Sequence, residues 1–392
     1  MLSVLSWARK ALGVRKALAG ATFGLAAVGL AACVPTTTGP ALGTGEAVQV
    51  ALLVPSGSGQ ASDESLARSL ENAARLAMAD LGGVKVDLRV YPTAGQPAQA
   101  ASAATQAVND GAKIILGPVF AQEANAAGNA VAASGVSILS FSNNPAIAGG
   151  NVFVLGTTFP NIANRLSRYA VRQGKSNILI LHDRTLAGDA GLAAIEASVL
   201  AASGSVVGVM GYEFSQNGIV QAAPAIAAAV RDTGANALFL TADTAGSLPL
   251  LTQLLRDNGL SPAVTQFLGL TRWDIPPATL ALPGVQGGWF ALPDPSLYQQ
   301  YAQRYSAAYG SAPHPISGLA YDGIAAIGAL ARRGGGLSTS ALTQGSGFAG
   351  VTGVFRLLPD GSNERGLAVA EIRNNQVVII EPAPRSFGGA GF

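Results

Sequence analysis

Few residues of this sequence have the types and spacing that catalysis requires. The two histidines, His182 and His314, are far apart and lack the spacing of metal ligands. The sequence contains no Gly-x-Ser-x-Gly elbow for a hydrolase nucleophile and no Walker loop for phosphates. Asp183 and Arg184 follow an apolar run, and such a pair is more typical of a solvated turn than of acid–base chemistry. We therefore predict that the protein is not an enzyme and that it uses no cofactor and no metal.

One glycine-rich turn resembles the start of a dinucleotide-binding motif. Gly57-Ser58-Gly59 follows an apolar run, as that motif requires, but Ser62 stands where its third glycine belongs. The next expected strand ends in Arg89-Val90-Tyr91, without the acidic residue that would bind a ribose. We interpret this turn as a loop at a cleft rather than as a nucleotide site.

Along the chain, short apolar runs that are typical of strands alternate with stretches of helical periodicity. In the first half, the expected strands are 48–54, 84–90, 114–116 and 136–139, and the expected helices are 65–81, 98–111 and 121–133. In the second half, the strands are 177–181, 206–212, 237–241 and 265–268, and the helices are 162–173, 192–202, 220–232 and 248–258. Two helices, 296–309 and 316–332, and three strand-like runs, 351–358, 368–373 and 377–380, follow. This alternation predicts an α/β fold of two doubly wound halves, each a parallel sheet between helices.

The turns after these strands are the expected binding residues. In open α/β sheets, ligands bind beyond the carboxyl ends of the strands, and two such halves that face each other form a cleft. The turns are rich in Ser, Asn, Thr and Gly, which offer small donors and acceptors to a polar ligand. We expect the cleft to be formed by Ser56, Phe120, Ala121, Gln122, Ser142, Asn143, Asn144, Asp183, Arg184, Asp243, Thr271 and Arg272.

The single cysteine, Cys33, ends a leader with a basic start and a glycine-broken apolar run from Ala17 to Leu30. The sequence Leu30-Ala31-Ala32-Cys33 resembles the lipobox of bacterial lipoproteins. This resemblance implies that residues 1–32 are a signal peptide and that Cys33 becomes a lipid-modified first residue. The apolar run is too short for a comfortable transmembrane helix, which needs about 20 apolar residues. We therefore expect a lipid at Cys33 to be the sole membrane attachment.

The charge balance argues against a nucleic-acid partner. The leader contains four of the 24 basic residues and no acidic one, so the remainder carries 20 basic against 22 acidic residues. No cluster of Lys and Arg indicates binding to nucleic acid. With Cys33 acylated, no thiol remains for a disulfide or a zinc site.

The length of the chain predicts two domains joined by several crossings. Residues 33–46 have the composition of a flexible tether. We expect one lobe from 47–156 with 291–350, a second from 157–290 with 351–383, and a disordered tail at 384–392. The crossings near Gly156, Phe290 and Gly350 would form a three-strand hinge.

Nearly the whole body, from Val48 to about Ile380, resembles the type I periplasmic-binding fold of the branched-chain amino-acid-binding family. The segments that carry this resemblance are VALLVPSGSG, GAKIILGPVFA, GVSILSFSNNP and SGLAYDGIAAI. By this resemblance, Ser142-Asn143-Asn144 would meet the head group of an amino acid.

Three positions depart from that family's pattern. Ala121 stands where a serine is usual, and Ala187 stands where a tyrosine often precedes the glycine of the sixth-strand turn. Relatives commonly have a carboxylate near the position of Thr271-Arg272, where this chain has a positive charge. An unpaired buried ammonium is costly, so these departures predict that leucine, isoleucine and valine do not bind tightly.

Two functions follow from these resemblances. GPVFAQEA and ILSFSNNPAIAGGNVFVLG resemble the penicillin-binding-protein activators, lipoproteins of the outer membrane that regulate peptidoglycan synthesis by contact with a peptidoglycan synthase. The main expectation is therefore a lipid-anchored activator on the periplasmic side of the envelope, at the outer membrane more than the inner. The alternative is the substrate-binding subunit of an ABC importer for amino acids or related small polar solutes, which would dock on an ABC permease.

Overall fold

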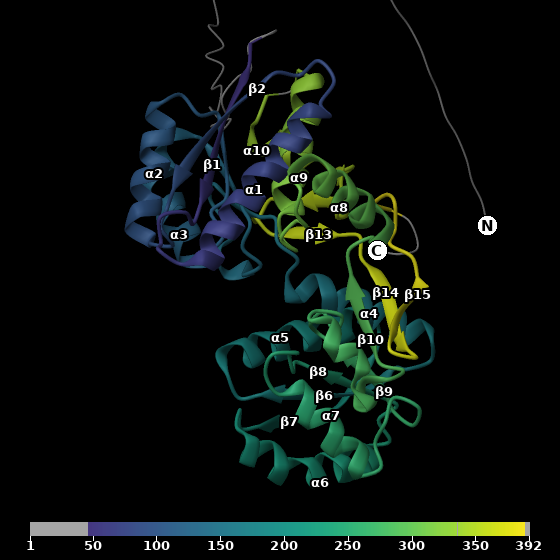
Figure 1. The fold of residues 1–392 in the computed structure, drawn as a ribbon. Helices are drawn as coiled ribbons and strands as arrows, with labels where there is room; N and C mark the ends of the chain where they lie inside the picture. Colours follow the sequence, from purple (N-terminus) through teal and green to yellow (C-terminus); the bar gives the residue numbers. More distant parts are fainter. Residues whose placement is uncertain (1–45, 335, 389–392) are drawn as a thin grey trace, which may run out of the picture. The chain divides into compact units, whose positions relative to one another are not determined.

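The computed structural model describes residues 46–334 and 336–388, which form an α/β structure (Figure 1). Cys33, the leader and most of the predicted tether lie outside the described residues. None of the helices in the described ranges is long and apolar enough to cross a membrane.

The first sheet is parallel and has the strand order β2-β1-β3-β4-β5. Its strands are β1 (Val48–Val54), β2 (Val86–Pro92), β3 (Ile114–Leu116), β4 (Ser137–Ser140) and β5 (Val152–Val154). Its connecting helices are α1 (Ala61–Ala79), α2 (Pro97–Asn109) and α3 (Ala121–Val131). Helices α8 (Pro295–Tyr309) and α9 (Gly318–Arg332) return to this sheet and contact α1. This half therefore combines residues from two distant parts of the chain.

The second sheet has seven strands in the order β15-β14-β10-β9-β8-β6-β7. The parallel strands are β6 (Asn177–Asp183), β7 (Ser205–Tyr212), β8 (Ala237–Leu240), β9 (Gln266–Gly269) and β10 (Trp289–Leu292). Strands β14 (Ala368–Arg373) and β15 (Gln376–Glu381) are added in antiparallel pairing. The helices of this half are α4 (Phe159–Arg172), α5 (Leu186–Ala201), α6 (Gln216–Thr233) and α7 (Leu248–Asp257). Two sheets, each with parallel strands between helices, confirm the predicted α/β class and its two lobes.

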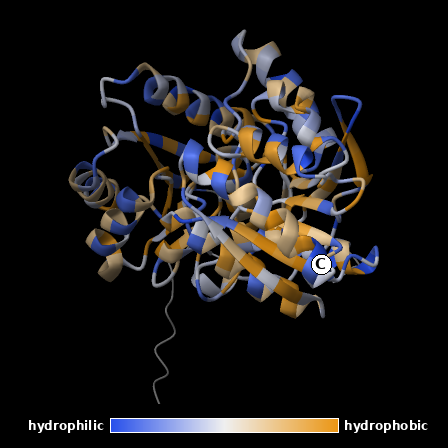
Figure 2. Cartoon of the chain, turned by 90° about the horizontal axis from the view of Figure 1, so that it is seen from below, coloured by the Kyte–Doolittle hydropathy of each residue, from blue (hydrophilic) through white to orange (hydrophobic). Residues whose placement is uncertain are grey.

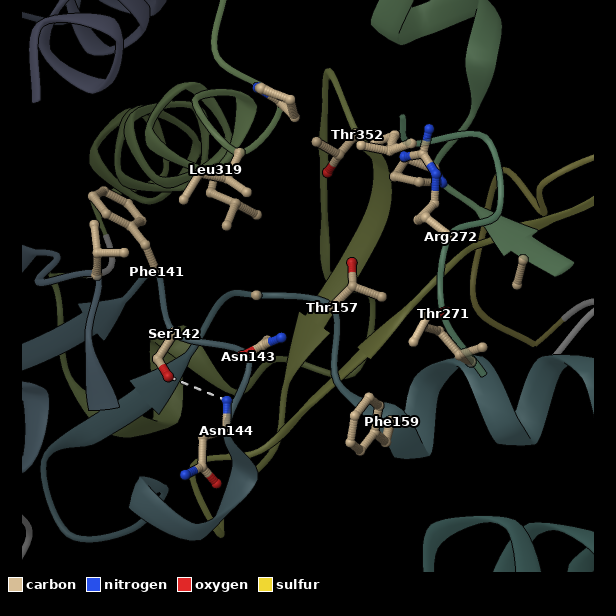
Figure 3. A pocket seen from close by; sticks show the side chains of 18 of the residues that line it. Phe141, Ser142, Asn143, Asn144, Thr157, Phe159, Thr271, Arg272, Leu319 and Thr352 are labelled. Carbon is tan, nitrogen blue, oxygen red and sulfur yellow. Dashed lines mark hydrogen bonds between the residues drawn. The ribbon is translucent and has the colours of Figure 1, made fainter. Parts of the chain in front are cut away.

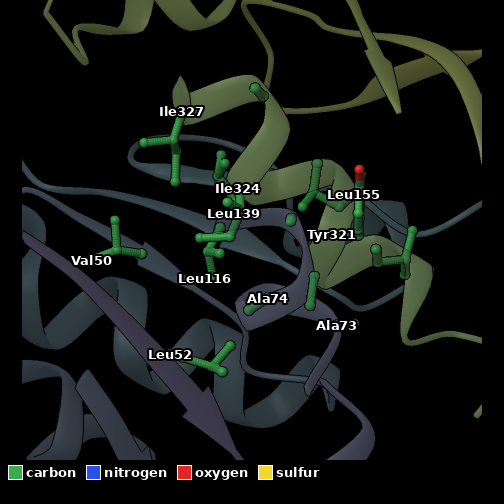
Figure 4. Close-up of a cluster of buried hydrophobic side chains, with 14 of the residues drawn as sticks. Val50, Leu52, Ala73, Ala74, Leu116, Leu139, Leu155, Tyr321, Ile324 and Ile327 are labelled. Carbon is green, nitrogen blue, oxygen red and sulfur yellow. The ribbon is translucent and has the colours of Figure 1, made fainter. Parts of the chain in front are cut away.

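The strands are buried on both faces, which explains their continuous apolar runs. Along β1, Val50 and Leu52 face a core shared with α1 and α9, whereas Ala51 and Leu53 face a core shared with α2 and α3. Figure 4 shows the first of these cores, where Leu116 and the other labelled side chains come together. The second sheet has the same two-sided arrangement, with α6 and α7 on one face and α4 and α5 on the other. Hydrophobic residues accordingly follow the inner strands in Figure 2, and hydrophilic residues are frequent on the surrounding helices and loops.

A small antiparallel sheet lies between β10 and β14 in the sequence. It contains β11 (Phe348–Gly350), β12 (Gly353–Leu357) and β13 (Asn363–Arg365), preceded by the short helix α10 (Thr339–Leu342). The predicted strand 351–358 corresponds mainly to β12, but its buried Phe355 and Leu357 join the core of the first sheet. The chain therefore passes to the second sheet after β13, rather than near Gly350 as expected. The physical reason is that β12 pairs with β11 and β13 instead of joining the second sheet.

Hydrogen bonds join the segments that connect the two sheets. Asn363 of β13 donates from Nδ2 to the carbonyl oxygens of Val154 (2.7 Å) and Gly156 (2.9 Å), at the end of β5. Asn161 of α4 donates to the Asn363 carbonyl (2.9 Å). The first segment that connects the two sheets, after β5, is therefore hydrogen-bonded to the third, at β13. The division of residues between two lobes otherwise stays a prediction.

The end of the described chain differs from the disordered tail that the sequence predicts. The guanidinium of Arg356 lies 4.6 Å from the ring centre of Phe387. Ala383 just before the predicted tail is buried. This cation–π contact ties Phe387 of the predicted tail to β12. Residues 389–392 lie outside the described part.

Candidate ligand-binding cleft

A cavity of about 670 Å³ lies where strands of both sheets end (Figure 3). Its lining comes from turns after β3, β4, β5 and β9 and from the segments that connect the sheets. These residues are Val119, Phe120, Ala121, Phe141, Ser142, Asn143, Asn144, Gly156, Thr157, Phe159, Ile162, Leu270, Thr271, Arg272, Ile275, Ala291, Pro293, Pro315, Ile316, Leu319 and Thr352. Its volume suits a small organic ligand.

Most of this lining is apolar. Phe141 and Leu319 lie on one side of the cavity in Figure 3, and Phe159 lies on another. Phe120 keeps 40% of its surface exposed although it borders the cavity. Large apolar side chains with free surface beside a cavity favour a ligand with an apolar or aromatic body.

Of the predicted triplet Ser142-Asn143-Asn144, only the middle residue has a side chain that makes no hydrogen bond within the described residues. The Ser142 hydroxyl accepts the backbone N–H of Asn144 (3.1 Å), and the Asn144 side chain accepts the N–H of Ala146 (2.9 Å). These two side chains therefore shape the turn. Asn143 makes no side-chain hydrogen bond within the described residues, and its amide points into the open region of Figure 3. Asn143 is therefore the best ligand-binding residue of the three.

Thr157 also points toward this open region, from the turn after β5 (Figure 3). Its hydroxyl makes no hydrogen bond to another described residue, so it is free to bind a ligand. The backbone at Gly156 lies very close to the Ser142 turn. A Cβ at this position would lie only 2.4 Å from the Ser142 carbonyl oxygen, so glycine allows the two turns to approach each other. The sequence analysis missed Thr157 because β5 has only three residues and was not identified as a strand.

Arg272 is the only charged residue that lines this cavity in the described chain, and its charge is already paired. Its Nε and Nη2 donate to the two carboxylate oxygens of Asp274, at 2.6 and 2.5 Å. The side chain of Arg272 is 35% exposed and that of Asp274 is 15% exposed. Asp274 therefore offsets the local positive charge that the sequence predicted. The carboxylate of Asp274 is therefore held by this pair, whereas the Nη1 donors of Arg272 make no hydrogen bond to another described residue.

Thr352 connects the cavity to a buried ion pair. Arg365 of β13 lies 3.5 Å from Asp322 of α9, and the side chains are 2% and 0% exposed. The Thr352 hydroxyl donates to Asp322 and accepts from Arg365 (2.7 Å). Arg365 also donates to the Leu155 carbonyl (2.8 Å), next to the first passage between the sheets. Burial raises the pKa of Asp322, whereas the charge of Arg365 and the donors around the carboxylate act in the opposite direction.

Five predicted cleft residues do not line this cavity. Asp183 is buried and accepts hydrogen bonds from Thr185 (2.5 Å) and Thr241 (2.9 Å). Arg184 forms a solvent-exposed ion pair with Glu213 (2.9 Å). The others are Ser56, Gln122 and Asp243, which lie on loops or at a helix start outside the lining. Asp183 thus supports its own turn instead of facing a ligand.

Ala121 and Phe120 begin α3, where a buried carboxyl group completes the turn. Glu123 is fully buried, and its side chain accepts the backbone N–H of Phe120 (3.4 Å). Burial raises the pKa of Glu123. Ala121 lines the cavity with a methyl group and, as the sequence analysis expected, offers no hydroxyl to a ligand.

The fold and this cleft define a two-lobed binding protein. A family model for periplasmic binding proteins matches residues 47–376, so the chain belongs to this family. No curated protein matches the chain.

Solved structures with the same fold cover nearly the whole described chain. A branched chain amino acid ABC transporter periplasmic ligand-binding protein from Burkholderia xenovorans LB400 is 18% identical, with a TM-score of 0.66 over 88% of this chain and 97% of that one. An ABC transporter substrate-binding protein from Desulfitobacterium hafniense, in complex with Leu, is 16% identical, with a TM-score of 0.64 over 86% and 100%. A solute-binding protein of an ABC transporter from Rhodopseudomonas palustris BisB5, in complex with 3,4-dihydroxybenzoic acid, is 19% identical, with a TM-score of 0.58 over 86% and 96%. These likenesses confirm the predicted type I periplasmic-binding fold.

Proposed function

We propose that this protein is the substrate-binding component of an ABC importer. The family match and the ABC-transporter proteins with the same fold support this role. A cavity between the strand ends of two sheets also suits a protein that encloses a small solute. A permease is then the partner expected for the loaded protein.

We further infer the class of ligand from one observation: the described lining contains no carboxylate. Asp274, which lies between the lining residues Arg272 and Ile275 in the sequence, is held by Arg272 through two hydrogen bonds. The ammonium group of an amino acid would therefore have no free anionic partner, and burying it unpaired costs kcal/mol rather than tenths. A carboxylic acid without an ammonium group, with an apolar or aromatic body, fits the lining better. The relative with 3,4-dihydroxybenzoic acid supports this class.

The activator function that the sequence analysis favoured has less support. It rested on the resemblance of two segments to the activators and on the departures at Ala121, Ala187 and Arg272, which argued against amino-acid binding. The positive charge at Arg272 also suits an importer whose ligand lacks an ammonium group. The solved relatives named above are described as transporter components, which favours the importer.

Calorimetric titration of the purified protein with benzoate, 3,4-dihydroxybenzoate and leucine tests the ligand class. We expect binding of at least one aromatic carboxylate, and no binding of leucine below millimolar concentration. Losing one hydrogen-bonded charge contact costs about 1.5–3 kcal/mol, and 1.4 kcal/mol is tenfold in affinity. Two such losses move a micromolar amino-acid site to roughly millimolar affinity. Micromolar binding of leucine would contradict the proposed class.

Two substitutions with opposite expected effects sharpen this test. Asp274→Asn releases Arg272, so a bound carboxylate should bind several-fold more tightly. Arg272→Ala removes the cation and leaves Asp274 to repel the ligand, so affinity should fall tenfold or more. Arg256→Ala, an exposed arginine at the end of α7, is the matched control and should leave affinity unchanged. Equal affinities in all three variants would show that the pair does not contact the ligand.

A further inference from the structure

A second cavity, of about 700 Å³, shares no lining residue with the ligand-binding cleft. It is formed by the end of α1, by α8 and α9, by the segment around β11, and by the chain after β15. Its lining includes the charged residues Asp80, Arg304, Arg332, Arg333 and Arg385. We call it the arginine hollow.

The charges around the arginine hollow are unbalanced. Four arginines line it, whereas Asp80 is the one acidic residue in the described lining. Both carboxylate oxygens of Asp80 accept hydrogen bonds from Arg304 (2.6 Å each), and one also accepts the Tyr321 hydroxyl (2.5 Å). The negative charge of Asp80 is therefore used within the protein and leaves three further cations without a carboxylate in the hollow.

These three guanidinium groups have donors to spare. Arg332 donates to the Leu81 carbonyl (2.8 Å), and Arg333 donates to the side chain of Gln344. Arg385 lines the hollow and makes no hydrogen bond or ion pair with another described residue. A guanidinium has five N–H donors in a fixed fork, which matches the oxygens of a carboxylate or phosphate. Most of these donors are available to a bound anion.

An apolar wall adjoins these charges. It contains Leu81 just after α1, Ala325 and Ala329 from α9, and Phe348 and Val354 from the small sheet. Arg332 donates to the Leu81 carbonyl, so the cationic and apolar parts of the hollow are neighbours. Contact with this wall removes apolar surface of a ligand from water, which favours binding. A ligand that uses both parts must carry a negative head and an apolar body.

We propose that the arginine hollow is a second binding site, for an amphipathic organic anion whose phosphate or carboxylate head meets Arg332, Arg333 and Arg385. The apolar part of that anion lies against Leu81, Phe348 and Val354. This site is independent of the solute proposed for the cleft. The same chemistry occurs in free organic phosphates and in the head groups of anionic lipids, so the experiment has an arm for each source.

In the first arm, the full chain is titrated with monomeric octyl phosphate and with inorganic phosphate by calorimetry. Octyl phosphate should bind at least tenfold more tightly, because inorganic phosphate cannot use the apolar wall. In the second arm, flotation compares phosphatidylglycerol vesicles with phosphatidylcholine vesicles. Preferential binding to either octyl phosphate or phosphatidylglycerol supports the proposal and identifies the source.

The decisive variant is Arg332→Ala combined with Arg333→Ala, which should weaken the observed binding at least tenfold. Arg231→Ala combined with Arg256→Ala removes two exposed arginines from the last turns of α6 and α7, so it is matched for charge and position. This control should bind within twofold of the unaltered protein.

Three results would overturn the proposal. One is the absence of binding in both arms, and another is equal loss of binding in the matched control. The third is equal affinity for inorganic and octyl phosphate, which would show that the apolar wall is unused. Thermal unfolding of each variant, measured in parallel, separates lost binding from lost folding.

Discussion

His314 is a partly buried histidine directly before Pro315 and Ile316, which line the cleft. Its Nδ1 accepts the backbone N–H of Ile316 (3.4 Å), which requires an unprotonated nitrogen. Burial lowers the pKa of this side chain below its ordinary value. The stabilisation that the neutral ring provides is therefore complete above the unfolded-state pKa, about 6.5, and is lost as the pH falls through the folded-state pKa.

We predict that the free energy of unfolding falls between pH 7.5 and pH 5.5, and that His314→Gln makes this dependence shallower. Urea unfolding at several pH values measures it. His182→Gln is the control, because it retains His314 and should retain the part of the pH dependence due to that residue. An unchanged slope in the His314 variant would exclude this histidine as its source.

At single positions, the sequence identified the turn at Ser142-Asn143-Asn144 but not which side chain is free. The type and place of these residues follow from the strand before them, whereas their hydrogen bonds depend on the exact path of the turn. Asn144 caps its own short helix, and that contact removes it from the candidates. Arg272 shows the same limit, because the pairing of residues 272 and 274 depends on side-chain geometry that no spacing rule predicts.

Among the elements, β13 links distant parts of the chain through Arg365. This guanidinium contacts Asp322 in α9 and the Leu155 carbonyl after β5. We predict that Arg365→Met lowers the free energy of unfolding by about 3–5 kcal/mol, since it leaves a buried carboxylate without its cation. Chemical denaturation at neutral pH provides the measurement.

Arg89→Met is the matched control for this strand arginine. Arg89 of β2 forms an exposed ion pair with Asp87 (3.0 Å), with side chains 48% and 41% exposed. Such surface pairs contribute about 0–1 kcal/mol. The double variant Asp322→Leu with Arg365→Met should recover much of the lost stability, because no charge is then buried alone. Similar losses in Arg365→Met and Arg89→Met would contradict this account.

The sequence predicted the long, strongly periodic elements well. It predicted the ends of these elements and the short strands less accurately. The strand 48–54 and the helix 248–258 agree with β1 and α7 to within a residue. Helix α1 begins at Ala61, four residues before the predicted start, because its first turn is polar and lacks an apolar residue that marks the period. Strands β5 and β10, of three and four residues, were missed, whereas the equally short β3 and β8 were predicted. The antiparallel pairing of β11, β12 and β13 depends on contacts between distant residues and could not be read locally.

For the whole molecule, the predicted membrane attachment rests on Cys33, which lies outside the described residues. We propose that this residue carries the lipid, as the lipobox implies. Cys33→Ser should move the protein from the membrane fraction to the soluble fraction, or leave its leader uncleaved. Because Cys33 is the single cysteine, one intact-mass measurement of the native protein decides the matter. A free thiol, or an intact residue 1 in the native protein, would exclude the lipid.

The order of the chain also affects how such a protein can be made and exported. The core of the first sheet begins with Val48 on β1 and ends with Phe355 and Leu357 on β12, so it is incomplete until nearly the whole chain is present. The second sheet likewise requires β14 and β15, close to the carboxyl end. Neither half can finish folding while the chain is still being synthesised, and truncated chains would expose apolar strands. This delay suits a polypeptide that is threaded unfolded through a membrane and acquires its structure only on the far side.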